Sequence, residues 1–463
     1  MSNRTLYRKK SSYKKYLGIL GFLMVVGAIG FVYFSPMFEQ NKPKISFEDK
    51  QFWNLKSPLV LALNDDTGLQ HYRVTYMAKG QEVVLDTKVV SKTKTSAKVQ
   101  ILPPLLNAFN KQDAAKLKIE VTDISKWNFL NGNVAVEQYD INIDTIVPKA
   151  EVIANSYAIR RGGSAVVVVY VHDSNLKEAY ISFNQKKKFR LIPFYKENYF
   201  AALIGWDVNI EQFERVNLVA LDKAKNSIKI KVPLYIRELK HKRSKLNISD
   251  KFVDKASKVV LQHMHEPVPN NQSDAFVKVN KDIRAQNVDF LRDIGLTKLN
   301  TDGIDDFKIK PFVRLKGSRQ VGNYADRRDY SYDGKKIDEA WHLGIDWASV
   351  KHAKIYSSNA GEVIFQDYLG IYGNTIIIDH GLGMMSLYAH TSSSDIKVGH
   401  RVKAGQKIAN TGATGAVFGD HLHFGILIQG IEVNPAEWMD KEWIKTRITN
   451  ILAEAKKVIN RHE

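Results

Sequence analysis

The chain has 463 residues, of which 44% are hydrophobic and 25% charged, and it contains no cysteine. At about 100–200 residues per domain, this length predicts roughly two to four domains, each able to form a hydrophobic core. The composition excludes a disordered chain, and the lack of cysteine excludes disulfides, thiolate catalysis and zinc sites built on sulfur. Lysine and arginine number 68 against 49 aspartates and glutamates. The resulting formal net charge of +19 favours polyanionic surroundings: nucleic acid, anionic lipid or an anionic cell wall.

The N-terminal segment predicts a single membrane-spanning helix. Residues 1–16 are rich in lysine and arginine and contain no acidic residue, and residues 17–34 contain no charged residue. An apolar stretch of about eighteen residues, at ~1.5 Å per residue, is long enough to cross a bilayer core. Because the basic flank stays in the cytoplasm, we expect a cytoplasmic tail over 1–16, an anchor over 17–36 and an exported remainder. The alternative is a signal peptide cleaved at Ala28-Ile29-Gly30.

The segment after the anchor has the texture of short β-strands separated by turns. Residues 165–171, for example, form a β-branched run that follows two glycines. A loose repeat is centred on Asp123 and Asp222, which lie about one immunoglobulin-like module (~100 residues) apart. We therefore expect two tandem immunoglobulin-like β-sandwiches, over 42–147 and 148–240. Their expected role is to space the rest of the chain from the membrane, with binding of the wall or of a partner as the alternative.

A helical linker is expected next, over residues 241–304. Residues 249–263 have apolar side chains at helical spacing with Ser249 as the N-cap, and residues 273–294 suggest a second helix. Such a hairpin can be a hinge, a lid or only a linker. We expect residues 249–294 or the second sandwich to cover part of the site described below.

The C-terminal part of the chain predicts a glycine-rich β domain over 305–440, followed by an amphipathic helix over 441–463. This helix is expected to dock onto the β domain, although its basic residues could also contact lipid. Seven of the 13 histidines lie between His342 and His423, so the site is expected in this domain.

Two pairs of side chains in this domain have the spacing of metal ligands. In a strand, residues two or four apart point to the same face, so His342 should meet Asp346, and His421 should lie beside His423. Gly344, between the first two, is expected to leave room for a metal. Two imidazoles and one carboxylate, with the fourth position left to water, are the ligand set of hydrolytic zinc.

A hydrolytic site also needs groups that are not ligands. With His390 there are four histidines near one carboxylate, and a fully coordinated zinc would be inert. Neutral histidines beside the metal can deprotonate the water and donate to the oxyanion. The residues alone do not say which histidines are ligands.

Residues 312–438 resemble the lysostaphin/LytM-type zinc metallopeptidases, which cut peptide bonds in bacterial peptidoglycan. The motifs that carry this resemblance are, in chain order, His342-x-Gly344-x-Asp346, 372–381 (YGNTIIIDHG), 387–390 (LYAH), 398–405 (VGHRVKAG), 411–415 (TGATG), 421–424 (HLHF) and Asn434-Pro435. The resemblance implies an antiparallel-β peptidase domain and zinc (Zn²⁺) as its cofactor. It also implies that His342, Asp346 and His423 are the zinc ligands. His390 and His421 are then the catalytic residues that polarise the water and stabilise the transition state.

Two positions depart from the pattern of this family. Many relatives have proline where Asp420 stands and glutamate where Gly425 stands. Neither residue is a ligand, but both are expected to border the substrate groove. The sequence therefore does not say which peptide the groove prefers.

The resemblance and the anchor together imply a zinc endopeptidase that hydrolyses peptidoglycan cross-links. Its catalytic domain would lie on the outer, periplasmic side of the bacterial cytoplasmic (inner) membrane, held by a single-pass helix. The alternatives are a D,D-carboxypeptidase acting on stem peptides and a non-catalytic LytM-like activator of a wall amidase. Expected partners are peptidoglycan, the membrane and, through the sandwiches, cell-wall or division proteins. An exported chain does not meet nucleic acid, so none is expected.

Overall fold

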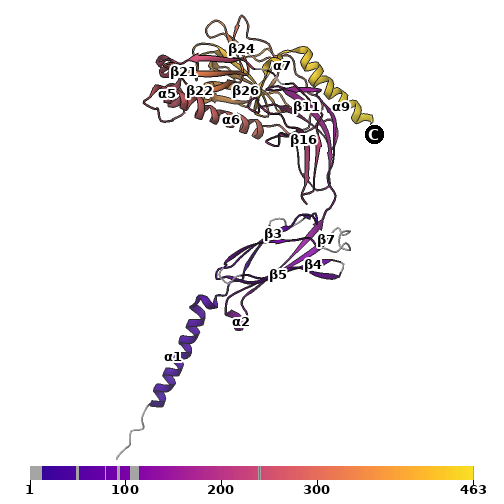
Figure 1. Ribbon diagram of the computed structural model, residues 1–463, viewed down its shortest axis with the longest axis vertical. Coiled ribbons are helices and arrows are strands. Elements are labelled where there is room, and N and C mark those ends of the chain that lie inside the picture. Colours follow the sequence, from indigo (N-terminus) through magenta and orange to yellow (C-terminus); the bar gives the residue numbers. More distant parts are fainter. Residues whose placement is uncertain are drawn as a thin grey trace, which may run out of the picture. The chain divides into compact units, whose positions relative to one another are not determined.

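A computed structural model describes residues 13–47, 52–78, 80–90, 94–104, 114–237, 239 and 241–461. Residues 1–12 of the expected cytoplasmic tail lie outside this part of the chain. The chain divides into two compact units (Figure 1). Unit 1 comprises Met1–Val147 and Asp222–Asn226, and unit 2 comprises Pro148–Leu221 and Ser227–Glu463. The expected mainly-β architecture with an N-terminal apolar helix is confirmed.

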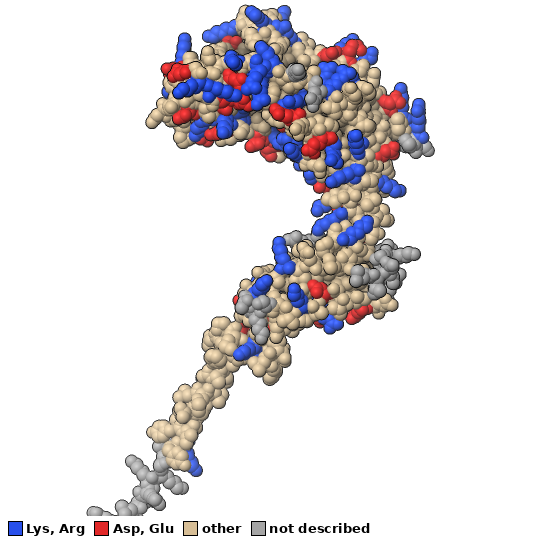
Figure 2. All heavy atoms as spheres, viewed as in Figure 1, with Lys and Arg blue, Asp and Glu red and all other residues tan. Residues whose placement is uncertain are grey.

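Unit 1 begins with the apolar helix α1 (Tyr13–Phe34), which has no buried residue. It is long and apolar enough to cross a membrane by length and composition. Figure 2 shows it as an uncharged rod apart from its N-terminal end. The helix ends because Pro36 cannot donate an amide hydrogen bond to continue it. A single 3-10 turn, η1 (Pro36–Phe38), follows.

The rest of unit 1 is two sheets that enclose one core. The three-stranded sheet has the order β1-β3-β6, and the five-stranded sheet has the order β2-β8-β7-β4-β5. Their bounds are β1 (Lys44–Phe47), β2 (Phe52–Trp53), β3 (Leu59–Asn64), β4 (Leu69–Ala78), β5 (Gln81–Val89), β6 (Ser96–Ile101), β7 (Ala114–Asp123) and β8 (Val134–Ile143). Side chains alternate between buried and more exposed along β3 and β7, so one face of each sheet lines the core. A short turn of helix, α2 (Trp127–Leu130), connects β7 to β8.

The repeat expected at Asp123 and Asp222 corresponds to two similar hydrogen-bonded turns. Asp123 accepts hydrogen bonds from the backbone and side-chain amides of Asn133, at 2.8 Å each. Asp222 accepts the same two bonds from Asn226, at 2.7 Å each. Each asparagine also donates to the backbone carbonyl of a residue that precedes the strands of its sandwich, namely Glu39 and Asp144. The immunoglobulin-like classification of the two sandwiches stays a prediction.

Unit 2 begins with a second pair of sheets. One has the order β14-β15-β11-β9 and the other β13-β12-β16-β17, and β10 pairs with β18. Their bounds are β9 (Lys149–Asn155), β10 (Ala158–Arg160), β11 (Ser164–His172), β12 (Leu176–Phe183), β13 (Lys187–Arg190), β14 (Ile192–Pro193), β15 (Tyr199–Gly205), β16 (Val216–Asp222), β17 (Ser227–Lys231) and β18 (Tyr235–Arg237).

The segment expected to be a helical linker is part strand and part helix. Residues Arg243–Asn247 form β19, which runs parallel to β21 (Asp326–Tyr332). Backbone pairing holds β19 in place, while the lysine and arginine side chains of its exposed positions face water. Two helical stretches follow, composed of α3 (Asp250–Phe252), η3 (Val253–Ser257), α4 (Lys258–His263), α5 (Gln272–Val277), η4 (Lys278–Ile283) and α6 (Arg284–Thr297). Ser249 caps the first stretch, as expected, by accepting from the amide of Phe252.

The C-terminal part of unit 2 is built on one large antiparallel sheet with the order β20-β23-β31-β27-β26-β25-β29, to which β32 adds beside β31. Two three-stranded sheets accompany it, with the orders β19-β21-β22 and β24-β30-β28. Their bounds are β20 (Arg319–Gly322), β22 (Lys335–His342), β23 (Ile345–Ala348), β24 (Lys354–Tyr356), β25 (Gly361–Tyr368), β26 (Asn374–Asp379), β27 (Met384–Ala389), β28 (Thr391–Ser394), β29 (Arg401–Val402), β30 (Lys407–Thr411), β31 (Leu422–Ile428) and β32 (Ile431–Val433). The chain closes with α7 (Pro435–Met439), α8 (Lys441–Ile444), η6 (Lys445–Thr449) and α9 (Asn450–Arg461).

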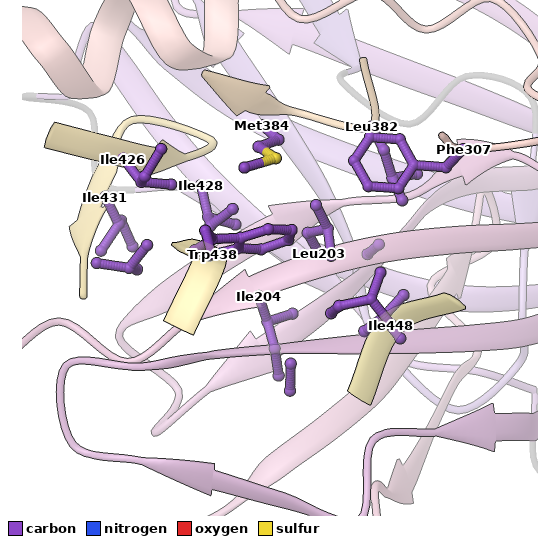
Figure 3. Close-up of a cluster of buried hydrophobic side chains, with 14 of the residues drawn as sticks. Leu203, Ile204, Phe307, Leu382, Met384, Ile426, Ile428, Ile431, Trp438 and Ile448 are labelled. Atoms are coloured by element: carbon purple, nitrogen blue, oxygen red, sulfur yellow. The ribbon is translucent and has the colours of Figure 1, made fainter. Parts of the chain in front are cut away.

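One hydrophobic core runs through the second sandwich and the large sheet. Leu203 and Ile204 of β15 lie in the same cluster as Ile428 of β31 and Trp438 of α7 (Figure 3). The C-terminal helix α9 packs against β9 and β11, so it docks onto the second sandwich rather than onto the large sheet. Its apolar stripe is buried there, as the periodicity predicts. The separate domains expected over 148–240, 241–304, 305–440 and 441–463 therefore stay a prediction.

Candidate metal centre

Three predicted ligands meet where the sheet β19-β21-β22 and the large sheet come together. His342 ends β22, Asp346 lies on β23, and His423 lies on β31, paired with Asp346 across the ladder. His342 Nε2 lies 2.9 Å from Asp346 Oδ1 and 3.1 Å from His423 Nδ1. His423 Nδ1 is 2.9 Å from the same carboxylate oxygen. All three side chains are buried.

The protonation of these groups fits a bound metal ion. His342 Nδ1 lies 2.8 Å from the carbonyl oxygen of Asn323, so it carries the proton and leaves a lone pair on Nε2. That lone pair faces a carboxylate oxygen, and two acceptors so close require a cation or a donated proton between them. His423 can donate from Nδ1 only by leaving a lone pair on its Nε2, which is buried without a partner among the described residues. A bound zinc ion would satisfy all three atoms, with His342, Asp346 and His423 as the residues that hold it.

His390 and His421 lie beside these ligands, as the resemblance implies. The rings of His390 and His421 are 4.9 Å apart between centroids, and the ring of His390 is 5.7 Å from that of His423. His390 Nδ1 donates to the backbone carbonyl of Thr414, and His421 Nδ1 donates to that of Gly419, at 2.8 Å each. Nε2 of each is therefore free to accept a proton when the ring is neutral. His421 Nε2 lies 3.7 Å from Asp346 Oδ1, so it faces the ligands.

Burial lowers the pKa of two of these histidines, His390 and His423. Burial lowers the pKa of His390 well below its usual range, and the neighbouring His421 and His423 lower it further. Burial likewise lowers the pKa of His423 to about 4. For Asp346, burial raises the pKa, but His342 and His423 more than offset this and hold it well below its usual range. Neutral imidazoles beside an ionised carboxylate are the forms that bind a cation.

The reason given for Gly344 is corrected by the structure. His342 and Asp346 do not share one strand, because the chain leaves β22 at His342 and enters β23 at Ile345. A Cβ atom on Gly344 would lie 2.5 Å from His423 Nε2, on the side of the ring that faces away from the other ligands. The glycine therefore makes room for the His423 ring and not for the metal.

Three residues that the sequence reasoning missed support the ligands. Arg328 Nη2 lies 3.4 Å from Asp346 Oδ2, the carboxylate oxygen that does not face the histidines. A Cβ atom on Gly322 would lie 2.2 Å from the same oxygen, so only glycine fits there. The hydroxyl of Tyr372, whose ring is 5.4 Å from that of His423, donates to Glu432. Arg328 and Gly322 fall in a segment rich in Asp, Arg and Tyr that spacing alone could not align.

The site opens onto a cavity of about 510 Å³. All five candidate site residues line it, together with Arg328, Tyr372 and Asp420. One wall comes from the helical segment, through Phe252, Ser257, Phe276, Val279, Asn280 and Arg284. The second sandwich contributes no lining residue among those described. Of the two segments expected to cover the groove, it is the helical one that borders the site, and its role as a cover stays a prediction.

Asp420, one of the two departures from the family pattern, holds the loop before His421. Its carboxylate accepts from the hydroxyl of Thr411 at 2.5 Å and from the backbone amide of His352 at 3.1 Å. It also lines the cavity, as expected of a groove residue. Gly425 lies within β31, and a Cβ there would touch Leu387 at 3.4 Å.

Residues 340–435 match the family model described as Peptidase family M23, and this range contains all five candidate residues. The chain is 34% identical over 131 residues to the DD-carboxypeptidase/endopeptidase Mpg of Neisseria meningitidis serogroup B, covering 28% of each chain. It is 42% identical over 81 residues to the murein hydrolase activator EnvC of Escherichia coli K12, covering 18% of this chain and 19% of that one. The alignments thus span less than a third of these relatives.

Among solved structures, the catalytic domain of lysostaphin from Staphylococcus simulans is 25% identical. It covers 27% of this chain and 94% of that one, with a TM-score of 0.23.

Proposed function

Because residues 340–435 form a Peptidase family M23 domain, we propose that this chain is a membrane-anchored zinc endopeptidase that hydrolyses the peptide cross-links of bacterial peptidoglycan. The observation that carries the proposal is the cluster of three buried nitrogen and oxygen atoms, 2.9–3.1 Å apart, with His390 and His421 beside it. A buried group of this kind is unstable without a cation, and its donor set is that of catalytic zinc.

In this proposal His342, Asp346 and His423 are the zinc ligands. Bound zinc would lower the pKa of a water molecule and polarise the scissile carbonyl. The hydrogen bond from His342 Nδ1 to Asn323 fixes the tautomer that turns Nε2 to the metal. Arg328 holds the second oxygen of Asp346, which keeps the first oxygen aimed at the ligand cluster.

His390 and His421 supply the proton transfers. Their Nδ1 protons are held by backbone carbonyls, so each ring can take up a proton only on Nε2. One accepts a proton from the attacking water on its Nε2. The other, once its Nε2 has taken up a proton from solvent, donates to the oxygen that becomes negative in the transition state. The proton taken from the water then passes to the leaving amine, which completes the cleavage of the peptide bond.

Anchoring rests on α1, which is apolar and exposed along its length and carries basic residues at its N-terminal side. A cleaved signal peptide is the alternative. The net charge of +19 suits a chain that works beside an anionic wall.

Two alternatives concern the reaction. The name of Mpg covers both carboxypeptidase and endopeptidase activity, so trimming of stem peptides by the same chemistry is the first. The likeness to EnvC suggests the second, a non-catalytic activator of an amidase. Against the activator stands the complete set of candidate ligands, with His390 and His421 beside them.

The test is a product analysis with the full chain in detergent and zinc. Cross-linked muropeptide dimers are incubated with the wild-type chain, with His421→Ala and with His400→Ala, an exposed histidine of the same domain as control. We expect dimers to become monomers with the wild type and with His400→Ala, and no conversion with His421→Ala. Loss of only a terminal alanine would identify a carboxypeptidase. No cleavage by a chain that binds zinc, together with stimulation of an amidase, would identify an activator.

A further inference from the structure

Two bulky apolar side chains project from the loop between β7 and β8. Phe129 is 95% exposed and Leu130 is 70% exposed, next to each other in α2. Single exposed apolar residues are common on protein surfaces, but an adjacent pair at the tip of one loop indicates a surface that is covered in use.

Hydrogen bonds fix this loop beside the end of the membrane helix. The backbone amide of Lys126 donates to the carbonyl of Met37 at 2.7 Å. The hydroxyl of Ser125 donates to the carbonyl of Glu39 at 2.7 Å, and the side chain of Asn133 donates to the same carbonyl at 2.9 Å. Both sides of the loop are therefore tied to the few residues that follow α1 (Figure 1).

Trp127, at the start of the loop, lies alongside the helix itself. It lines a pocket of about 370 Å³ together with Val25, Ala28, Ile29, Val32 and Tyr33 of α1. Val25 is nine residues from the end of the helix at Phe34, or ~14 Å at the helical rise. If α1 spans the membrane, a side chain at this level is within the outer leaflet and not above it.

We propose that the loop Trp127–Leu130 enters the outer leaflet of the membrane beside α1, so that phospholipid acyl chains fill this pocket and cover Phe129 and Leu130. This inference rests on the anchoring by α1 in the proposed function and not on the peptidase reaction. Trp127 matches the aromatic residues that membrane proteins place at the interface, while Phe129 has no polar group and suits the acyl chains. Lys126 is exposed just before them, where its ammonium group can reach the lipid headgroups.

The backbone of the loop is compatible with this position. Irregular backbone exposed to lipid is avoided because its polar groups have no water to bind. Within this loop, however, the amides of Leu130, Asn131 and Gly132 donate to carbonyls of Lys126, Asn128 and Trp127. The turn thus satisfies three of its own donors, and its apolar side chains can face acyl chains at low cost.

The lack of cysteine makes the position of the loop directly measurable. An environment-sensitive fluorophore is attached to Phe129→Cys in the full chain, which is reconstituted in phosphatidylethanolamine/phosphatidylglycerol vesicles. Quenching by lipids brominated on their acyl chains is compared with quenching by aqueous iodide. Ile29→Cys, within α1, reports whether the helix is in the bilayer. Glu82→Cys is the control in water, because it pairs with Met77 at the end of β4 opposite the loop.

We expect the label at position 129 to be quenched by brominated lipid at least twofold more than the label at position 82, and to be protected from iodide. If position 29 is quenched by lipid while position 129 behaves like position 82, the inference is wrong and the anchor stands. If position 29 is also accessible to iodide, the anchor fails and the inference fails with it. Cleavage of muropeptides is measured separately and is affected by neither outcome.

A second variant tests the cause of insertion. Phe129→Asp combined with Leu130→Asp is expected to move a label at Asn131→Cys from lipid to water. Val84→Asp, at a half-exposed position in the middle of β5, is the control and should leave that label where it is. An unchanged label in the double variant would contradict the inference.

Discussion

The two β-sandwiches share a sequence repeat but differ in how they are buried. Among the described residues, the core of the first is made of residues from its own strands and from Val90, which directly follows β5. The core of the second continues into the large sheet of the peptidase and into the C-terminal helix. The pair of hydrogen bonds from asparagine to aspartate, at Asp123 and at Asp222, is the same in both, although the turn is longer in the first. A shared local motif therefore indicates a shared fold, but it does not tell which outer surfaces become covered.

The sequence of one strand shows that the sheet of the second sandwich is covered on both faces. In β7 of the first sandwich, buried positions alternate with more exposed ones. In β11 of the second, six successive residues from Ser164 are buried. A strand that is covered on both faces reads as a continuous apolar run, and the β-branched run over 165–171 is such a run. It predicts that something packs on the outer face of this sheet, though not which element.

Removal of zinc is expected to have the largest effect, because it should lower the stability of unit 2 and leave that of unit 1 unchanged. A ligand present at about a thousand times its Kd stabilises the folded state by ~4 kcal/mol, so a chelator should lower the unfolding free energy of unit 2 by about that amount. Unit 1 has no part in this site and should unfold at an unchanged temperature. Calorimetry with and without chelator measures both transitions. Asp346→Asn is the control, since it should make unit 2 insensitive to zinc.

A matched pair of leucines tests whether the shared core couples the second sandwich to the peptidase. Leu203 and Leu61 are both fully buried, the first in the shared core and the second in the core of unit 1. Each change to alanine should cost ~3 kcal/mol in its own unit. Only Leu203→Ala should also lower the temperature at which muropeptide cleavage is lost. If cleavage survives to the same temperature in both variants, the second sandwich is independent of the peptidase.

The pH dependence of this coupling is carried by Glu437. Its carboxylate accepts from the amide of Ser164 in the second sandwich at 2.9 Å, and burial raises its pKa to about 7. A carboxyl whose pKa is raised on folding contributes stability below its unfolded pKa near 4.5, and this is lost as the pH rises through 7. The loss amounts to about 3 kcal/mol.

Glu437→Gln removes this titration and keeps an acceptor for Ser164. The stability of unit 2, measured against that of unit 1 in the same chain, should therefore fall less between pH 5 and pH 7.5 in this variant. Equal slopes for the two chains would show that Glu437 ionises in the folded state as it does in water.

Sequence reasoning located the site more completely than the fold around it. The five candidate residues were found because a metal site needs a few residue types at fixed spacing. Three of them form one cluster, and His390 and His421 lie beside it. The hydrogen bonds to the carbonyls of Asn323 and Thr414 could not be predicted, because any residue offers a carbonyl. The strand β19 was missed because its short, charged sequence has no apolar run, and what holds it is backbone pairing with β21 together with the ion pair between Arg243 and Asp329.

The smallest expected effect concerns the helical segment, which is also part of unit 2 and not a free connector. Phe252 of this segment lies 4.2 Å, between ring centroids, from Phe418 of the loop that precedes His421. Residues of the same segment pack on the large sheet, so a chain that starts near position 300 would lose part of its core as well as its cover. A point change is therefore the cleaner test of whether the segment restrains the enzyme.

An aromatic pair of this kind is worth ~1 kcal/mol, which corresponds to about a fivefold change in the population of an open form. Phe418→Ala should therefore raise the rate of cleavage of cross-linked dimers about fivefold, because it removes the contact that holds the segment against the loop. Phe418 is 71% exposed, so its loss leaves no cavity in the core. Phe290→Ala is the control: it removes a similar ring contact, with Phe365 at 5.0 Å, from the same segment but away from the cavity. A rate that is unchanged or lower in Phe418→Ala, with zinc binding intact, would mean that this contact positions substrate. The helical wall would then be a fixed part of the groove that shapes which peptide fits beside His421.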